Sequence, residues 1–221
     1  MPDLVPVVLA DLARVFAALR VRWYVFGAQA VIAAGFVRTT LDIDVTVEMP
    51  RTGTAALLAA LDRSGFTMRD VGDTATFIAQ TRIVPVTHSA TGIPVDVVLA
   101  GPGLEDEMMA RAILRTVRGT KVPFVATDDL IALKLLAGRP KDLEDVAALL
   151  RARPRDLSLE VARQRVSELG AMIDDSTLTT SFDRLVQEAT GGPSPRAKPK
   201  KPPATPATGR GGRASRTRRR R

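Results

Sequence analysis

The stretch FGAQAVIAAGFVRTTLDIDVTVE, residues 26–48, places a glycine after an apolar strand and an acidic strand after one short helix. The strand predicted from Leu41 to Glu48 alternates between acidic or hydroxyl side chains on one side and aliphatic side chains on the other. Side chains two residues apart on a strand point the same way, with Cα atoms about 6.6 Å apart. Asp42 and Asp44 are therefore predicted to point into one cleft, where they repel each other unless a cation lies between them.

Two other positions complete the predicted site. Gly27 stands where a strand turns into a helix, and a residue without a side chain lets backbone N–H groups approach a phosphate closely. The strand-like run at 93–99 places Asp96 alone among apolar residues, where an unpaired carboxylate would be costly. Three carboxylates make an all-oxygen site suited to Mg²⁺. Asp42, Asp44 and Asp96 are therefore predicted to hold two metal ions and to activate an acceptor hydroxyl.

Hydrophobic periodicity predicts a mixed sheet first and helices afterwards, which favours an α/β (α+β) fold. The predicted helices are 3–20, the residues after Gly27, 52–64, 104–113, 127–137, 141–152, 158–170 and 177–189. The predicted strands are 23–26, 41–48, 75–79, 82–87, 93–99 and a hairpin around Gly119. The expected organisation is an α/β core at 1–125, a helical part at 126–190 and a tail at 191–221.

The positive charge of the chain belongs to this tail. The formal net charge is +8, from 32 Lys and Arg against 24 Asp and Glu. Residues 191–221 hold 11 of those basic residues and no acidic one, so the rest of the chain is near −3. A segment of Pro, Gly, Ala, Ser, Thr and cations cannot bury enough apolar area to offset its ordering entropy, so it is predicted to be disordered. Such a run could hold RNA or DNA phosphates, or it could be a solubilising end without a fixed partner.

Composition excludes several classes of function. The chain has no cysteine, which rules out a disulfide framework, a thiolate metal site and a cysteine nucleophile. The start has no basic leader, and the apolar stretch 25–37 is interrupted by Gln29 and is shorter than the roughly 18 residues that a membrane helix needs. We expect a soluble, cytoplasmic protein with no membrane contact.

Together these motifs resemble the nucleotidyltransferase superfamily, typified by DNA polymerase β and the minimal nucleotidyltransferases. The local pattern is most similar to the AbiEii-type nucleotidyltransferase toxins, and the resemblance covers roughly residues 20–150. The matching positions are Gly27-Ala28, Arg38-Thr39-Thr40-Leu41-Asp42-Ile43-Asp44, Lys134 and Arg139-Pro140-Lys141-Asp142-Leu143-Glu144-Asp145. One departure is the turn, which reads Gly-Gly or Gly-Ser in the superfamily and continues here with Ala28 and Gln29.

The resemblance implies a nucleotidyltransferase-type sheet and an NTP as co-substrate. The nucleotide-binding positions that it implies are Gly27, Ala28, Arg38, Thr40, Lys134, Lys141 and Asp142. Lys134 would contact the phosphates, and Lys141 with Asp142 would help close the site. Two structural alternatives remain open. Arg38 could pair with Asp42 when no metal is bound, and residues 139–145 could be a salt-bridge network at a helix start, with Asp145 paired to Arg139 or Lys141.

Three functional hypotheses follow from this pattern. The leading one is transfer of a nucleoside monophosphate from an NTP to an acceptor hydroxyl, such as the 3′ end of a tRNA, by the toxin of a toxin–antitoxin pair. The second keeps this chemistry but takes as acceptor a partner protein, including a cognate toxin or antitoxin, or a small molecule such as an antibiotic. The third is a catalytically silent nucleotide- or RNA-binding module. It is motivated by the residues at positions 28 and 29 and by the basic tail.

Overall fold

The computed structural model describes residues 4–36, 38, 40 and 42–191. The tail from 192 onward, for which we predicted disorder and RNA contacts, lies outside the described residues, as do positions 37, 39 and 41. Within the described part the fold is a mixed α/β structure, in which a seven-stranded sheet is flanked by helices. The predicted fold class is thereby confirmed.

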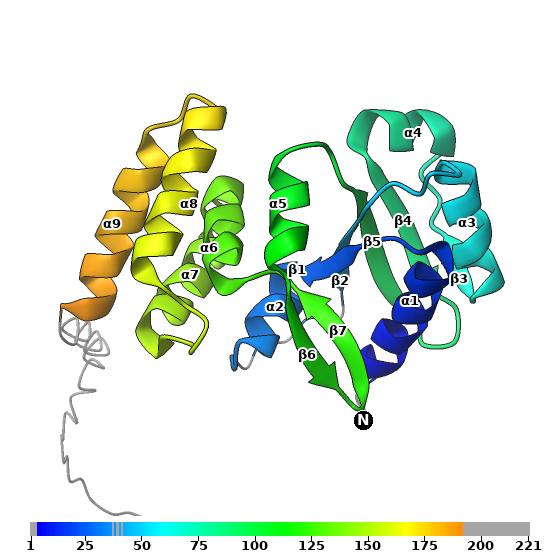
Figure 1. The fold of residues 1–221 in the computed structure, drawn as a ribbon, viewed down its shortest axis with the longest axis horizontal. Coiled ribbons are helices and arrows are strands. Elements are labelled where there is room, and N and C mark those ends of the chain that lie inside the picture. Colours follow the sequence, from blue (N-terminus) through cyan, green and yellow to red (C-terminus); the bar gives the residue numbers. More distant parts are fainter. Residues whose placement is uncertain (1–3, 37, 39, 41, 192–221) are drawn as a thin grey trace, which may run out of the picture.

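Figure 1 shows the elements along the chain. The strands are β1 (Trp23–Phe26), β2 (Ile43–Val47), β3 (Phe66–Met68), β4 (Ile83–His88), β5 (Ile93–Leu99), β6 (Ile113–Val117) and β7 (Thr120–Phe124). The helices between them are α1 (Val5–Leu19), α2 (Gly27–Ala33), α3 (Thr54–Arg63), α4 (Thr74–Thr81) and α5 (Leu104–Arg111). The helices that follow the sheet are α6 (Thr127–Ala137), α7 (Pro140–Ala152), α8 (Leu159–Met172) and α9 (Thr177–Thr190).

The strand order is β3-β4-β5-β2-β1-β7-β6. The β2–β5 and β1–β7 pairs are parallel, whereas the β1–β2, β3–β4, β4–β5 and β6–β7 pairs are antiparallel. The two central strands β2 and β5 therefore run side by side in the same direction, although about fifty residues separate them in the sequence. This topology brings distant acidic residues of the chain next to each other.

The two faces of the central sheet are covered differently. On one face Val45 and Val97 are fully buried and lie in register on neighbouring strands. His88 shares this face, and its Nε2 lies 3.0 Å from Asp11 Oδ2 on α1. On the other face the Tyr24 hydroxyl donates to Sδ of a methionine on α5 at 3.6 Å. Asp44 and Asp96 lie on this second face, because they alternate with the buried valines.

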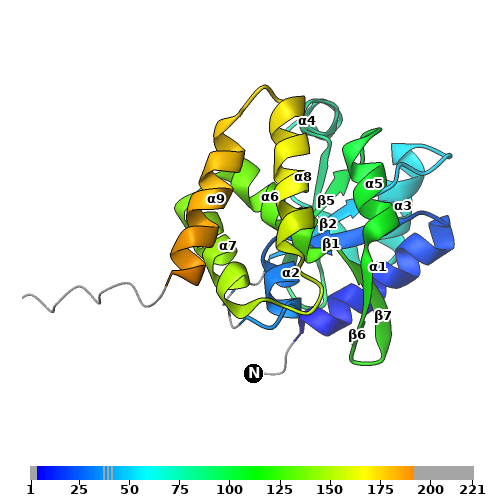
Figure 2. The ribbon, with the colours of Figure 1, turned by 60° about the vertical axis from the view of Figure 1, so that its left-hand side comes forward.

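The last four helices form a layer beside the second face of the sheet (Figure 2). The central helix of this layer is α6, which packs against α7, α8, α9 and the short helix α2. It buries residues all round, including Leu130, Ile131 and Leu135, which explains the absence of a strong amphipathic pattern in its sequence. The α2–α6 contact joins this layer to strands β1 and β2, where the predicted site lies.

Two local predictions were wrong. Residues 75–79 alternate like a strand but belong to α4, because the Asp73 side chain caps the helix by accepting hydrogen bonds from the backbone N–H groups of residues 75 and 76. The three-residue strand β3 was not predicted, since it is too short to show an alternation. The other predicted elements agree with the structure to within two or three residues. Among the described residues, no helix has the length and apolarity needed to cross a lipid bilayer.

Candidate active site

One row of side chains crosses the sheet on its second face. Asp44 on β2 pairs in register with Phe26 on β1 and with Asp96 on β5. Asp96 in turn pairs with Pro85 on β4, and the backbone N–H of Arg69, just after β3, donates to the Pro85 carbonyl at 2.9 Å. Residues in register on neighbouring strands point to the same side. The row therefore places the carboxyl groups of Asp44 and Asp96 next to each other.

Gly27 forms the wall beside Asp44. This glycine begins α2 with φ +62°, and a Cβ at its position would lie 2.1 Å from Asp44 Oδ2 and 2.9 Å from Asp44 Cγ. A residue with a side chain would therefore both strain the backbone and displace the carboxylate. The predicted role of Gly27 as bare backbone at the site has this geometric basis, although the group that it faces is the carboxylate itself.

Asp44 is the most strongly perturbed carboxyl group of the site. Burial raises its pKa, the negative charges of Asp96 and Asp42 raise it further, and the result is a pKa of about 6. The positive charges of Lys134 and Arg139 act in the opposite direction but do not compensate. Burial is the largest cause of the raised pKa, and the charges of neighbouring residues modify it in both directions.

Asp96 is bound by a cation that the sequence did not indicate. Nη2 of Arg69 donates a hydrogen bond to Asp96 Oδ1 and forms an ion pair with it. Both side chains remain about two-fifths exposed, at 38% for Arg69 and 40% for Asp96. Nε of Arg69 is buried and has no hydrogen-bond partner among the described residues.

Asp42 lies one residue before β2 and is exposed. Its backbone carbonyl accepts a hydrogen bond from Nε2 of the buried Gln29 at 3.3 Å. Gln29 is one of the residues that depart from the superfamily turn, and in this chain it ties α2 to the start of the acidic strand. Asp42 and Asp44, with Asp96, are called the carboxylate site below.

The donor chemistry of the carboxylate site fits a hard divalent cation. Its side chains offer only oxygen, the Asp44 carboxylate lies against the bare backbone of Gly27, and Arg69 pairs with Asp96. Among the residues described, no three His, Cys, Asp or Glu side chains are arranged as a complete metal-binding group. Asp96 is held by Arg69 in this arrangement, while Asp44 and Asp96 remain neighbours in register.

A second cluster lies where α6 meets α7. Lys134 is buried, and its Nζ lies 2.9 Å from Asp142 Oδ1 and 2.7 Å from Asp145 Oδ2. Arg139 pairs with Asp142, and Arg38 pairs with Asp145. These five residues are called the ionic network below. Burial acts to raise the pKa of Asp142, but the hydrogen bonds from Arg139 and Lys134 outweigh it and lower the pKa below its usual value.

The network corrects two structural alternatives drawn from the sequence. Arg38 pairs with Asp145 and not with Asp42, and it ties the segment before β2 to α7. Asp145 pairs with Arg38 and Lys134, whereas we expected Arg139 or Lys141. Lys134 and Asp142, predicted as nucleotide-binding, are bound to each other, and Lys134 still acts on Asp44 through its charge.

The remaining predicted residues lie around this region with fewer contacts. Lys141 is exposed in the first turn of α7 and makes no ion pair with another described residue. Ala28 is half-buried in the first turn of α2. Thr40 lines a cavity of about 330 Å³ together with Gln29 and Arg38. Whether these residues contact a nucleotide stays a prediction.

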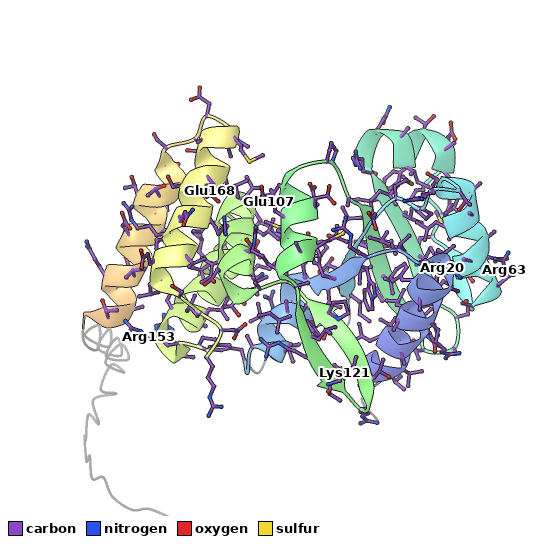
Figure 3. The ribbon with its side chains drawn as sticks, in the orientation of Figure 1. Arg20, Arg63, Glu107, Lys121, Arg153 and Glu168 are labelled. Atoms are coloured by element: carbon purple, nitrogen blue, oxygen red, sulfur yellow. The ribbon has the colours of Figure 1, made fainter. Side chains whose placement is uncertain are left out.

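Two larger cavities of the described structure lie elsewhere. One of about 450 Å³ lies at the turn between α8 and α9, and one of about 420 Å³ lies between α5 and α8, where it is lined by Glu107 and Glu168 (Figure 3). Neither contains a residue of the carboxylate site. We assign the site from its residues, because charged groups on a sheet face can bind a ligand without forming a deep pocket.

The sequence analysis did not predict two residues of this region as site residues. Arg139 belongs to a quoted motif, and its charge lowers the pKa of Asp44; the cationic joint at Gly138-Arg139-Pro140 was the available signal. Arg69 had no signal, because its link to Asp96 depends on strand pairings that local sequence does not reveal.

Comparison with known proteins supports the fold. No family model and no curated protein matches this sequence. Among solved structures, the antibiotic-resistance factor ANT(2″)-Ia, determined in solution, is similar with a TM-score of 0.55 at 14% identity, covering 79% of this chain and 95% of that one. An antigenic nucleotidyltransferase-like protein from Paracoccidioides brasiliensis is similar with a TM-score of 0.51 at 14% identity, covering 86% and 98%. The chain has the nucleotidyltransferase fold, whereas the AbiEii-like assignment stays a prediction.

Proposed function

We propose that this protein is a Mg²⁺-dependent nucleotidyltransferase, which transfers a nucleoside monophosphate from an NTP to an acceptor hydroxyl and releases pyrophosphate. The observation that carries the proposal is the register of Asp44 and Asp96 on adjacent strands, with Gly27 packed against the Asp44 carboxylate. Such an excess of negative charge is costly without a cation. It is useful to a protein that binds metal and the triphosphate together.

Each carboxylate has a proposed role. Asp42 and Asp44 hold Mg²⁺, and Asp96 completes the site and accepts the proton of the attacking hydroxyl. When bound, Mg²⁺ neutralises phosphate charge and polarises the phosphoryl group. Gly27 leaves space beside Asp44, and the hydrogen bond from Gln29 fixes the backbone of Asp42.

The cations near the α6–α7 joint are proposed to face the triphosphate. Arg139 and Lys141 are exposed there, with 62% of the Arg139 side chain accessible. The charge of Arg139 lowers the pKa of Asp44, which supports the proposal that its guanidinium binds a phosphate beside the metal. Lys134 contributes mainly through its charge, since Asp142 and Asp145 occupy its ammonium group. We propose Ala28, Arg38, Thr40 and Asp142 as the surrounding wall.

For the acceptor we propose the 3′ end of a tRNA, retained by the basic residues of 191–221. Growth inhibition in the cytoplasm, neutralised by a cognate antitoxin, would follow from such a modification. A small hydroxyl-bearing molecule is the second candidate acceptor, because the fold also matches a protein described as an antibiotic-resistance factor. Binding of the tRNA acceptor would depend on the basic tail, whereas binding of a small molecule would not.

The test uses the full chain, each of four labelled NTPs and Mg²⁺, with total tRNA or a panel of aminoglycosides as acceptor. We expect the wild type to transfer label, EDTA to abolish transfer, and Asp44→Asn to reduce it on the order of 10²–10³-fold. Asp62→Asn, an exposed aspartate on α3, is the matched control and should behave as wild type.

Two results would contradict the proposal. Equal transfer by wild type and Asp44→Asn would refute the assigned site. Tight NTP binding in calorimetry without transfer to any acceptor would identify a silent nucleotide-binding module instead. For the acceptor, deletion of residues 192–221 should weaken transfer to tRNA and leave transfer to an aminoglycoside unchanged.

A further inference from the structure

Arg69 lies at the end of the cross-sheet row, opposite the carboxylates. The pairs Phe66–His88, Thr67–Thr87 and Met68–Val86 set the register of β3 on β4, and the hydrogen bond from the Arg69 N–H to the Pro85 carbonyl continues it by one residue. Arg69 therefore points to the same side of the sheet as Pro85 and Asp96. Its position is determined by strand pairing and not by a loop.

The distance across this row demands a long side chain. Neighbouring strands lie about 4.8 Å apart, so the backbones of Arg69 and Asp96, with β4 between them, are separated by about 10 Å. Pro85 occupies the intermediate position and is buried. The guanidinium crosses above it, which explains why Nε of Arg69 is buried without a partner while Nη2 reaches Asp96 Oδ1.

Stability alone does not explain this contact. Both side chains are more than one-third exposed, and ion pairs of that kind contribute little to the free energy of folding. What the contact does is fix the Asp96 carboxyl group through one oxygen, Oδ1. The other oxygen then remains for a second partner. Hydrogen bonds of this kind orient the carboxylates that bind metals and tune their affinity.

We propose that Arg69 is a positioning residue of the transfer site, an inference that rests on the proposed function. It holds Oδ1 of Asp96 and thereby directs Oδ2 toward the side of Asp44, where the metal ion and the acceptor hydroxyl meet. It also supplies the positive charge that lets three aspartates share one sheet face before a metal binds. Arg69 acts through Asp96 and does not itself touch the nucleotide.

The experiment compares the full-length wild type with Arg69→Met and Arg69→Lys. Binding of Mn²⁺ alone is measured by electron paramagnetic resonance, and kcat and KM for the NTP are measured separately. Arg69→Met should weaken Mn²⁺ binding about 10- to 100-fold and lower kcat by a similar factor, with little change in KM. Arg69→Lys should recover part of both, because it keeps the charge but not the planar fork.

The control is Arg163→Met, which removes an exposed arginine whose Nε and Nη2 lie 2.9 and 3.0 Å from Asp183 between α8 and α9. It should leave Mn²⁺ binding and kcat unchanged. In an Asp96→Asn background, Arg69→Met should cause no further loss of Mn²⁺ binding or of kcat, because Arg69 acts only through Asp96. That comparison stays informative even where Arg69→Met lowers stability.

The outcomes separate this inference from the proposed function. A wild type that binds no Mn²⁺ and transfers no label contradicts the proposed function, and the role of Arg69 with it. A wild type that binds and transfers, with Arg69→Met equal to it in both measurements, overturns only the role of Arg69. An additional loss from Arg69→Met in the Asp96→Asn background would also overturn it.

Discussion

The carboxylate site and the ionic network contain the same kinds of side chain but have opposite charge balances. At the carboxylate site three aspartates face one contacting guanidinium, whereas in the network two aspartates meet one lysine and two arginines among the described residues. Burial, together with the charges of Asp96 and Asp42, raises the pKa of Asp44 to about 6. In the network, the hydrogen bonds from Arg139 and Lys134 outweigh burial and lower the pKa of Asp142. The ionic network holds one more positive than negative charge, and both of its carboxylates are paired with cations. Unbalanced negative charge beside bare backbone is what a bound cation would relieve.

The largest expected effect tests the structural side of this comparison. Asp142→Ala leaves the buried ammonium of Lys134 with one carboxylate in place of two, and breaking a buried pair costs about 3–5 kcal/mol. Urea unfolding of the full chain measures this loss. Asp96 belongs to the carboxylate site and forms a partly exposed ion pair with Arg69. Asp96→Ala should therefore lower the free energy of unfolding by less than about 1 kcal/mol. Equal losses of stability in the two variants would show that the ionic network contributes no more to folding than the carboxylate site does.

Gly27→Ala tests the functional side. The new Cβ would displace the Asp44 carboxylate, and we expect transfer to fall about 100-fold, which corresponds to about 2.7 kcal/mol. Gly65→Ala is the matched control, because Gly65 also has a positive φ, of +81°, but no atom within 4 Å of the added Cβ. Both variants should lose about 1 kcal/mol of stability from backbone strain. If Gly65→Ala reduced transfer equally, the close approach at Gly27 would not matter.

The two regions also differ in how far their sequence could predict them. Alternation in β2 and an aspartate isolated among apolar residues in β5 predicted that Asp44 and Asp96 each point away from the buried valines, because the direction of a strand side chain depends on local spacing. Their position side by side comes from the pairing of β2 with β5. The partners of these residues depend on pairing between distant segments. Arg38 and Asp145 are 107 residues apart, and Arg69 reaches Asp96 only through the register of three strands. Local patterns carry no information on such pairings.

A pH titration examines the excess charge directly. In metal-free protein the pKa of Asp44 is about 6, above that of an unfolded aspartate, so the folded state binds this proton more tightly. The resulting stability is fully present below about pH 4 and is lost as the pH rises through 6. Asp44→Asn cannot ionise, so at pH 7.5 in EDTA its free energy of unfolding should exceed that of the wild type by roughly 3 kcal/mol.

This difference should vanish toward pH 4, and adding Mg²⁺ at pH 7.5 should stabilise the wild type but not the variant. Thermal unfolding at several pH values measures both effects, and comparing the two proteins cancels the titration of all other groups. A variant that is less stable than the wild type at pH 7.5 in EDTA would contradict the charge imbalance assigned to the carboxylate site.

The smallest effect concerns the departure from the superfamily turn. Gln29→Leu keeps the volume of the buried side chain and removes its hydrogen bond to the Asp42 carbonyl, a loss of about 1 kcal/mol. Because Asp42 is exposed, water can replace this bond, and we expect transfer to fall about fivefold with the KM for NTP nearly unchanged. Gln164→Leu, which removes an exposed 2.8 Å hydrogen bond to Glu168, is the control. A large rise in KM would instead mean that Gln29 contacts the triphosphate, which would move it from the support of the carboxylate site into the nucleotide pocket.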